Sequence, residues 1–188
     1  MEGGATYTLR HRLFRVCWAL TWALFAAWTP PQMVAWRRML LRAFGARIAP
    51  KANIYGTARI WYPPNLEMED YACLGPGVNC YCMAPIKLRR YALASQGAYL
   101  CAGSHDIHGG DFVLVTKPIT LEERAWVAAE AFVGPGVTVG EGAVLGARAV
   151  AFRDLEPWTA YVGNPAQPSG SRRGKDEPLT AGLGPRAK

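Results

Sequence analysis

Apolar residues recur at every sixth position over much of the chain, a period that fits neither a helix of 3.6 residues per turn nor a simple alternating strand. The repeat is clearest over residues 121–150, which divide into the hexads LEERAW, VAAEAF, VGPGVT, VGEGAV and LGARAV. The first position is always Leu or Val, and the fifth is always Ala or Val. A six-residue unit fits a short strand plus a corner, repeated three times in a triangular coil of about 18 residues. The hexads therefore predict a parallel β-helix, with the first residue inside and the small fifth residue at a crowded corner.

The same period continues toward the N-terminus in three blocks, which are residues 48–65, 68–85 and 88–105. The dipeptides Leu66-Glu67 and Ile86-Lys87 separate these blocks, and we expect each dipeptide to form a bulge at one corner. Glycine at the second position of several hexads is expected to allow the tight backbone of the turns. Residues 106–120 interrupt the repeat and predict a loop extruded from the solenoid, where functional residues tend to lie.

The N-terminal region, residues 10–44, has no hexads and is rich in Trp, Leu and Arg. Pro30-Pro31 divides it into two expected helices. The apolar run over 16–28 is shorter than the roughly 20 residues that a membrane-spanning helix needs. Two interpretations stay open at this point. The helices either lie in a membrane interface or cap the open end of the solenoid core.

Composition and charge limit the possible classes of protein but do not identify a function. The chain of 188 residues has 21 basic and 14 acidic side chains, and its ends are the basic parts. Charge alone does not choose among nucleic acid, an anionic membrane and a phosphorylated cofactor. The five cysteines lack zinc spacing and are interpreted as reduced thiols, and with three histidines we expect no metal site. We expect a helical segment (1–45), a solenoid domain (46–166) and a flexible tail (167–188) that is rich in Gly, Pro, Ser, Arg and Lys.

His105 occupies a defined place in the repeat. It is the sixth residue of the hexad LCAGSH, directly before the break, so its side chain is expected to point outward from a corner. The interior position of that hexad is already filled by Leu100. A histidine that titrates near neutral pH can remove a proton from a hydroxyl group. His108, in the expected loop, has no spacing that distinguishes it from an ordinary surface residue.

Four segments of the chain resemble a known family. They are ARIWYPPNLEMEDYACLGPGVNCY (58–81), SQGAYLCAGSHDI (95–107), PITLEERAWVAAEAFVGPGVTVGEGAVLGARAV (118–150) and EPWTAYVGNPA (156–166). The family is that of the hexapeptide-repeat sugar O-acetyltransferases, and the colanic acid biosynthesis acetyltransferases are its most similar branch. The resemblance covers roughly residues 10–166. It implies a left-handed parallel β-helix, a homotrimer with active sites between subunits, and acetyl transfer from acetyl-CoA to a sugar hydroxyl with His105 as general base.

The resemblance also implies residues that hold acetyl-CoA. Trp126 would lie beside the acyl and pantetheine end, Ala129 and Ala147 along the pantetheine groove, and Phe152 and Arg153 near the adenine end. Arg153 has a physical argument of its own, because a guanidinium can bind phosphate with two hydrogen bonds. It fits equally well as an exposed arginine at the end of a coil. No metal is implied, and no covalent acyl-enzyme.

The acceptor side is less constrained by the sequence. Asn79 is the sixth residue of its hexad, like His105, and is expected to point outward toward a sugar hydroxyl. Asp106 either orients the histidine or forms the turn into the loop. The resemblance favours a saccharide acceptor, such as a lipid-linked exopolysaccharide precursor at the cytoplasmic face of a membrane, and no nucleic acid. N-acetylation of an amino sugar or sugar nucleotide is the alternative activity, and a non-catalytic solenoid is the alternative class.

Overall fold

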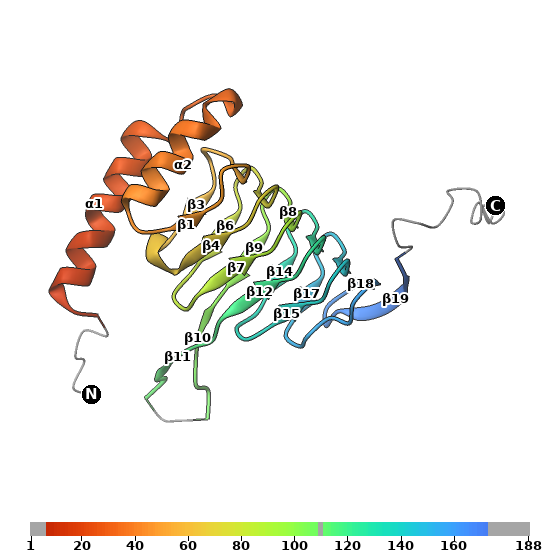
Figure 1. Cartoon of the computed structure of the whole chain (residues 1–188). Coiled ribbons are helices and arrows are strands. Elements are labelled where there is room, and N and C mark those ends of the chain that lie inside the picture. The colour runs from red at the N-terminus through yellow and green to blue at the C-terminus, as the bar shows by residue number, and fades with distance from the viewer. Residues whose placement is uncertain (1–6, 109–110, 173–188) are drawn as a thin grey trace.

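A parallel β-helix preceded by two α-helices makes up the computed structural model, which describes residues 7–108 and 111–172 (Figure 1). Short strands of successive coils stack side by side, so each face of the solenoid is a parallel sheet. The solenoid has about six turns. The predicted left-handed parallel β-helix with N-terminal helices is therefore the fold of this chain.

Three sheets form the faces of the described solenoid, and their strands are parallel except for the last strand of the second sheet. The first sheet contains β1 (Arg47–Ile48), β4 (Leu66–Met68), β7 (Ile86–Leu88), β12 (Ile119–Leu121) and β15 (Thr138–Val139). The second contains β2 (Asn53–Ile54), β5 (Cys73–Leu74), β8 (Leu93–Ala94), β13 (Trp126–Val127), β16 (Val144–Leu145), β18 (Thr159–Val162) and β19 (Gln167–Ser171). The third contains β3 (Arg59–Ile60), β6 (Asn79–Tyr81), β9 (Tyr99–Cys101), β14 (Phe132–Val133) and β17 (Val150–Ala151).

The core consists of hexad positions one and five. First-position residues such as Ile54, Leu100 and Leu145 are fully buried along the axis of the solenoid. Alanines at the fifth position, among them Ala125 and Ala143, are also fully buried. Along the strands of the coils, buried side chains alternate with outward ones, because successive residues of a strand point to opposite faces. The positions predicted to be interior are thus confirmed.

The early coils are two residues longer than the later ones, and the extra residues belong to strands. Leu66 lies beside Ile86 in the first sheet, whereas Thr120 lies beside Thr138, so the coil shortens from 20 to 18 residues. The bulges predicted at Leu66-Glu67 and Ile86-Lys87 are wrong. Both dipeptides extend β4 and β7, after the 3-10 turn η2 (Pro63–Asn65) in the first case, because Leu66 and Ile86 can bury their side chains there.

The turns use hexad position four, and not the second-position glycines, for the left-handed backbone. Position four has positive φ in both glycine and other residues, for example Gly142 at 64° and Arg124 at 58°. Gly140, at position two, is required for another reason. A Cβ there would lie 2.5 Å from the carbonyl oxygen of Leu155 in the next coil. Close stacking of coils therefore selects glycine at position two, which corrects the role predicted for it.

The N-terminal helices are α1 (Leu9–Phe25) and α2 (Val34–Ala43), joined through the 3-10 turn η1 (Pro31–Met33). They cover the N-terminal end of the solenoid (Figure 1). The indole Nε1 of Trp18 donates to the carbonyl of Ile60 at 2.7 Å, and that of Trp22 donates to the carbonyl of Ala58 at 3.0 Å. One face of α1 thus caps the open core. Neither helix has the length and apolarity that crossing a membrane requires, within the part of the chain described here.

The C-terminal region differs from its prediction over its first residues. Residues 167–171, expected to belong to a flexible tail, form β19 and pair antiparallel with β18. Arg172 then returns to the solenoid, where its Nη1 donates to the carbonyls of Arg124 and Gly142. These contacts explain the order of a segment that has no hydrophobic period. Residues 173–188 lie outside the described part of the chain.

Candidate active site

His105 is held at a corner of the solenoid by the hairpin that follows it. It ends β10 (Gly103–His105), which pairs antiparallel with β11 (Leu114–Thr116) and leaves the solenoid body as a protruding arm (Figure 1). The imidazole is exposed, and its Nδ1 lies 2.6 Å from the carbonyl oxygen of Phe112. A carbonyl only accepts, so Nδ1–H donates and the neutral ring keeps its lone pair on Nε2. The imidazole is therefore oriented with a free basic nitrogen.

The predicted loop 106–120 contains the second strand of a β-hairpin, β11, which pairs with β10. The backbone N–H of Asp106 donates to the carbonyl of Val113 at 2.9 Å, which closes the base of the hairpin tip beside His105. Phe112 has a φ of 47°, a backbone conformation that residues other than glycine seldom adopt. That turn directs the Phe112 carbonyl toward the imidazole. Residues 119 and 120 rejoin the solenoid in β12, earlier than predicted.

An open cleft of about 460 Å³ lies against His105. Helix α1 forms one wall with Arg12 and Arg15, and Tyr81 of β6 lies on the solenoid side. Tyr7 and Met83 also contribute. None of these residues was expected at the site. The sequence shows that residues 10–44 are rich in arginine, but nothing in the spacing indicates that α1 runs past the corner where His105 lies.

Asn79 lies near this cleft without lining it. It is half-buried in β6, two residues before Tyr81, so both side chains point to the outer face of the third sheet. Tyr99 is its register partner on β9. Burial, the neighbouring Cys101 and Tyr81 raise the pKa of Tyr99 to about 12, which keeps this phenol neutral. The outward direction predicted for Asn79 is thus seen, next to aromatic hydroxyl groups.

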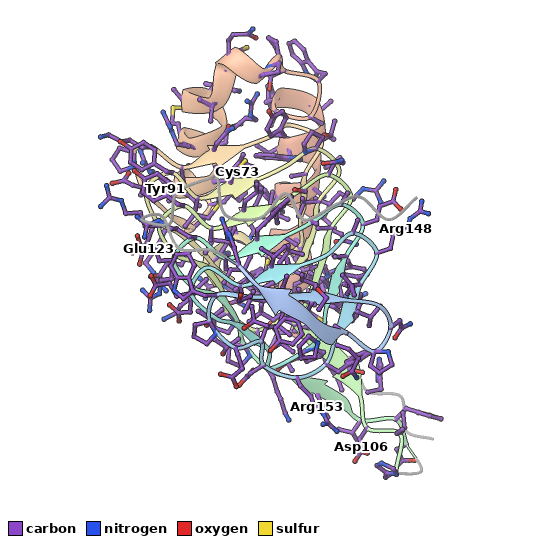
Figure 2. The ribbon with its side chains drawn as sticks, turned by 90° about the vertical axis from the view of Figure 1, so that its right-hand side faces the viewer. Cys73, Tyr91, Asp106, Glu123, Arg148 and Arg153 are labelled. Carbon is purple, nitrogen blue, oxygen red and sulfur yellow. The ribbon has the colours of Figure 1, made fainter. Side chains whose placement is uncertain are left out.

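Asp106 forms the turn of the hairpin. Its Oδ1 accepts from the backbone N–H of His108 at 2.9 Å, the pattern by which an aspartate stabilises a turn. Figure 2 shows Asp106 on the protruding arm, beyond the body of the solenoid. The turn-forming interpretation fits this geometry. The carbonyl of Phe112, and not the carboxylate of Asp106, is the group that contacts the imidazole.

The residues predicted to hold acetyl-CoA lie on two parts of the surface. Trp126 is on the second sheet, where its Nε1 donates to Ser95 Oγ at 2.9 Å, and it lines a groove together with Arg124 and Arg172. Phe152 and Arg153 follow the third sheet and line a separate hollow of about 340 Å³ at the C-terminal coils. One chain therefore does not bring Trp126 together with His105.

The two alanines predicted for the pantetheine groove occupy equivalent turns between the second and third sheets, one coil apart. Ala129 is half-buried and Ala147 is exposed. The carbonyl of Ala129 accepts from the backbone N–H of Arg148 at 2.9 Å. One of the two lone pairs of this carbonyl oxygen therefore accepts a hydrogen bond from the next coil.

The cysteines of the described chain form no disulfide and contribute to no cluster that could bind a metal. All five cysteines are free thiols, as predicted, and Cys80 and Cys82 are buried. A hydrogen bond with Cys82, together with burial, raises the pKa of Cys80 well above its ordinary value. Within residues 7–108 and 111–172, no three His, Cys, Asp or Glu side chains gather in a way that could hold a metal ion.

Comparisons with known proteins identify the family. No protein-family model matches the chain. It is 41% identical over 149 residues to an Escherichia coli protein named as a colanic acid biosynthesis acetyltransferase, WcaF, covering 79% of this chain and 81% of that one. A hexapeptide-repeat-containing acetyltransferase of Vibrio cholerae, solved with acetyl-CoA, superposes with a TM-score of 0.78 at 20% identity, covering 92% of this chain and 94% of that one.

A maltose O-acetyltransferase of Clostridium difficile superposes equally well, with a TM-score of 0.78 at 18% identity, covering 89% of this chain and 90% of that one. At such low identity the two solved structures establish the fold. The identity to the Escherichia coli protein extends over most of both chains. The chain belongs to the hexapeptide-repeat acetyltransferases, in the branch of the colanic acid biosynthesis acetyltransferases.

Proposed function

We propose that the protein transfers the acetyl group of acetyl-CoA to a hydroxyl of a saccharide, with His105 as general base. The observation that carries this proposal is the hydrogen bond of 2.6 Å between His105 Nδ1 and the Phe112 carbonyl. In the neutral imidazole this bond places the proton on Nδ1 and the lone pair on Nε2, beside an open cleft that can admit a sugar. A solenoid without catalysis would have no need to orient an exposed imidazole in this way.

The chemistry is direct attack. Nε2 of His105 takes the proton of the acceptor hydroxyl while its oxygen bonds to the thioester carbonyl carbon. The bond from carbon to sulfur then breaks, and the imidazolium returns its proton to the departing thiolate. Acetylated saccharide and free coenzyme A are the products, and the histidine is regenerated neutral. The buried cysteines have no part in this sequence, because no acyl-enzyme forms.

Trp126, Ala129, Ala147, Phe152 and Arg153 would hold acetyl-CoA. The acetyl-CoA bound to the similar Vibrio cholerae protein supports this cosubstrate. Because His105 and Trp126 lie on different faces of one chain, a homotrimer with composite sites is part of the proposal. Arg153 is exposed at the C-terminal coils, and its guanidinium would bind a phosphate of the nucleotide end.

The acceptor we propose is an exopolysaccharide precursor that is reached from the cytoplasmic face of a membrane. The relationship to a protein named for colanic acid biosynthesis supports the saccharide. The outer face of α1 and α2 supports the membrane contact of residues 10–44. Large apolar side chains are exposed there, with Leu24 62% and Trp28 71% accessible. Such a surface suits a lipid-linked acceptor.

Replacement of His105 by alanine tests the catalytic assignment. We expect kcat for release of coenzyme A to fall by roughly 10²- to 10⁴-fold, the usual contribution of a positioned base. His108→Ala is the matched control, because His108 lies on the same hairpin and contacts Asp106 only through its backbone N–H. Undiminished turnover in His105→Ala would remove the assignment. Paired hydroxyl and amine acceptors, with the acetylated atom identified by NMR, distinguish O- from N-acetylation.

A further inference from the structure

Two arginine side chains line the cleft that holds His105. Arg12 and Arg15 are three residues apart on α1, so they lie on one side of the helix, and both line the cleft. No carboxylate is among the residues that line it, in the described part of the chain. The cleft beside the proposed base is therefore positively charged, although a neutral sugar would require no cation there.

The helix that holds these arginines is fixed against the first coil. Trp18, three residues after Arg15, is buried and donates to the carbonyl of Ile60 at 2.7 Å. The guanidinium of Arg15 lies 4.2 Å from the centre of the Trp61 ring, a cation–π contact that limits its rotation. The cap Thr8 accepts from the backbone N–H of His11 at 3.3 Å and anchors the first turn. The two charges are thus presented at a defined place.

The position of the arginines along the solenoid separates them from the proposed nucleotide end of acetyl-CoA. Helix α1 covers the first coil, while Phe152 and Arg153 belong to the last coils (Figure 1). His105 follows β9, between these ends. Acetyl-CoA that extends from Arg153 toward His105 approaches from the C-terminal side. The space between His105 and α1 is then left for the acceptor.

We propose that Arg12 and Arg15 bind the phosphate of a phosphorylated saccharide acceptor and so place its hydroxyl at His105. This inference rests on the proposed acetyl transfer and names the class of its acceptor. Guanidinium groups bind phosphate through paired, charge-assisted hydrogen bonds. Two of them match the charge of about −1.5 to −2 on a phosphate monoester at neutral pH. The phosphate belongs either to a soluble sugar phosphate or to a lipid-linked saccharide.

Titration of the full-length protein with inorganic pyrophosphate, in saturating coenzyme A, measures this subsite directly. Coenzyme A occupies its own phosphate site, so the heat of binding reports the second one. We expect binding to the wild type and at least about tenfold weaker binding to Arg12→Gln, because a charge-assisted pair is lost. Arg10→Gln is the matched control, since Arg10 is exposed on the same helix and does not line the cleft. Equal weakening by both variants, or no binding to the wild type, would overturn the proposal.

Kinetics with galactose and galactose 1-phosphate separate this inference from the proposed function. In Arg12→Gln, KM for the phosphorylated acceptor should rise at least about tenfold more than KM for galactose, which has no phosphate to lose a partner. Failure of the wild type to acetylate either sugar counts against the proposed transfer, whereas the pyrophosphate titration still judges the subsite. Displacement of pyrophosphate by galactose 1-phosphate identifies a soluble source. Displacement by phosphatidylcholine vesicles that contain a polyprenyl phosphate identifies a lipid-linked one, and displacement by neither overturns the proposal.

Discussion

Arg37 is a fully buried cation that joins the N-terminal helices to the solenoid. Its Nε donates to the carbonyl of Ile54 at 2.6 Å, and its two terminal nitrogens donate to the carbonyls of Pro30 and Pro31 at 2.8 Å. Nη1 also donates to Thr29 Oγ1 at 2.8 Å. Burial lowers the pKa of Arg37, yet a guanidinium stays charged at physiological pH. A planar group with five donors thus satisfies carbonyls that a turn would otherwise bury unpaired.

Arg37→Met keeps an unbranched apolar stem and removes every one of these donors. We expect the free energy of unfolding to fall by about 3 kcal/mol or more, because buried and partly buried carbonyls lose their partner. Arg38→Met is the control, since Arg38 makes a single bond of 3.1 Å to the carbonyl of Ala52 and is half-buried. Urea denaturation followed by circular dichroism measures both. Equal losses in the two variants would contradict the role given to Arg37.

Single hexad positions could be predicted where packing alone selects the residue. Burial on the axis selects an aliphatic side chain at position one, as at Leu145, and the corner selects alanine at position five. Position four could not be predicted, because tolerance of a positive φ there is shared by Gly142 and Arg124 and so has no clear residue signature. Glu122 and Ala128 also occupy position two. Glycine is required there only where the next coil lies too close for a Cβ, as at Gly140.

At the scale of elements, α1 is compatible with both roles that the sequence left open, as a cap of the solenoid core and as a helix in a membrane interface. Each role would use a different face of the helix. Trp18 and Trp22 face the first coil and cap its core. The other face presents an apolar stripe, with Leu13, Leu20 and Leu24 each more than half exposed. No charged residue occurs between residues 16 and 36. Periodicity indicated an apolar helix, but only the packed structure separates the face that is covered from the face that is not.

The apolar stripe predicts binding to lipid vesicles. Replacing Leu13, Leu20 and Leu24 by glutamine should lower the partition coefficient onto vesicles of phosphatidylglycerol and phosphatidylcholine by at least about tenfold, because three apolar side chains no longer enter the interface. Ile107→Gln and Val162→Gln are controls, since these exposed apolar residues lie away from the helices. Flotation assays measure the bound fraction. Unchanged flotation of the triple variant would assign the stripe to another contact, such as a neighbouring subunit.

The sequence predicted that a segment leaves the solenoid after His105, but it predicted a loop and not a β-hairpin. The break in the hexads located this segment, and β11 pairs antiparallel with β10 to form the hairpin. The contact that orients His105 is a backbone carbonyl, that of Phe112. A main-chain acceptor is present in every residue, so no sequence pattern could have identified it. The carboxylate of Asp106 was the visible candidate and serves the turn instead.

At the scale of the whole molecule, the sequence names candidate site residues but does not show how an assembly would bring them together. His105 and Trp126 were both named from the sequence, yet they lie on different faces of one chain. Which faces meet depends on the packing of subunits, and hexads that record only the interior of one solenoid do not encode it. The arginines of the His105 cleft were missed for a related reason, because the docking angle of α1 brings them there.

A homotrimer with composite sites makes a prediction that a monomer cannot satisfy. If His105 of one subunit acts with Trp126 of the next, His105→Ala and Trp126→Ala are each impaired alone, but a mixed trimer contains some interfaces with both residues intact. Random mixing of equal amounts restores roughly a quarter of the interfaces in a cyclic assembly. Unfolding and refolding the two variants together, and then measuring release of coenzyme A, checks this. Activity that never exceeds the mean of the separate variants would place His105 and Trp126 in independent roles, and sedimentation near the 20.5 kDa of one chain would exclude the trimer itself.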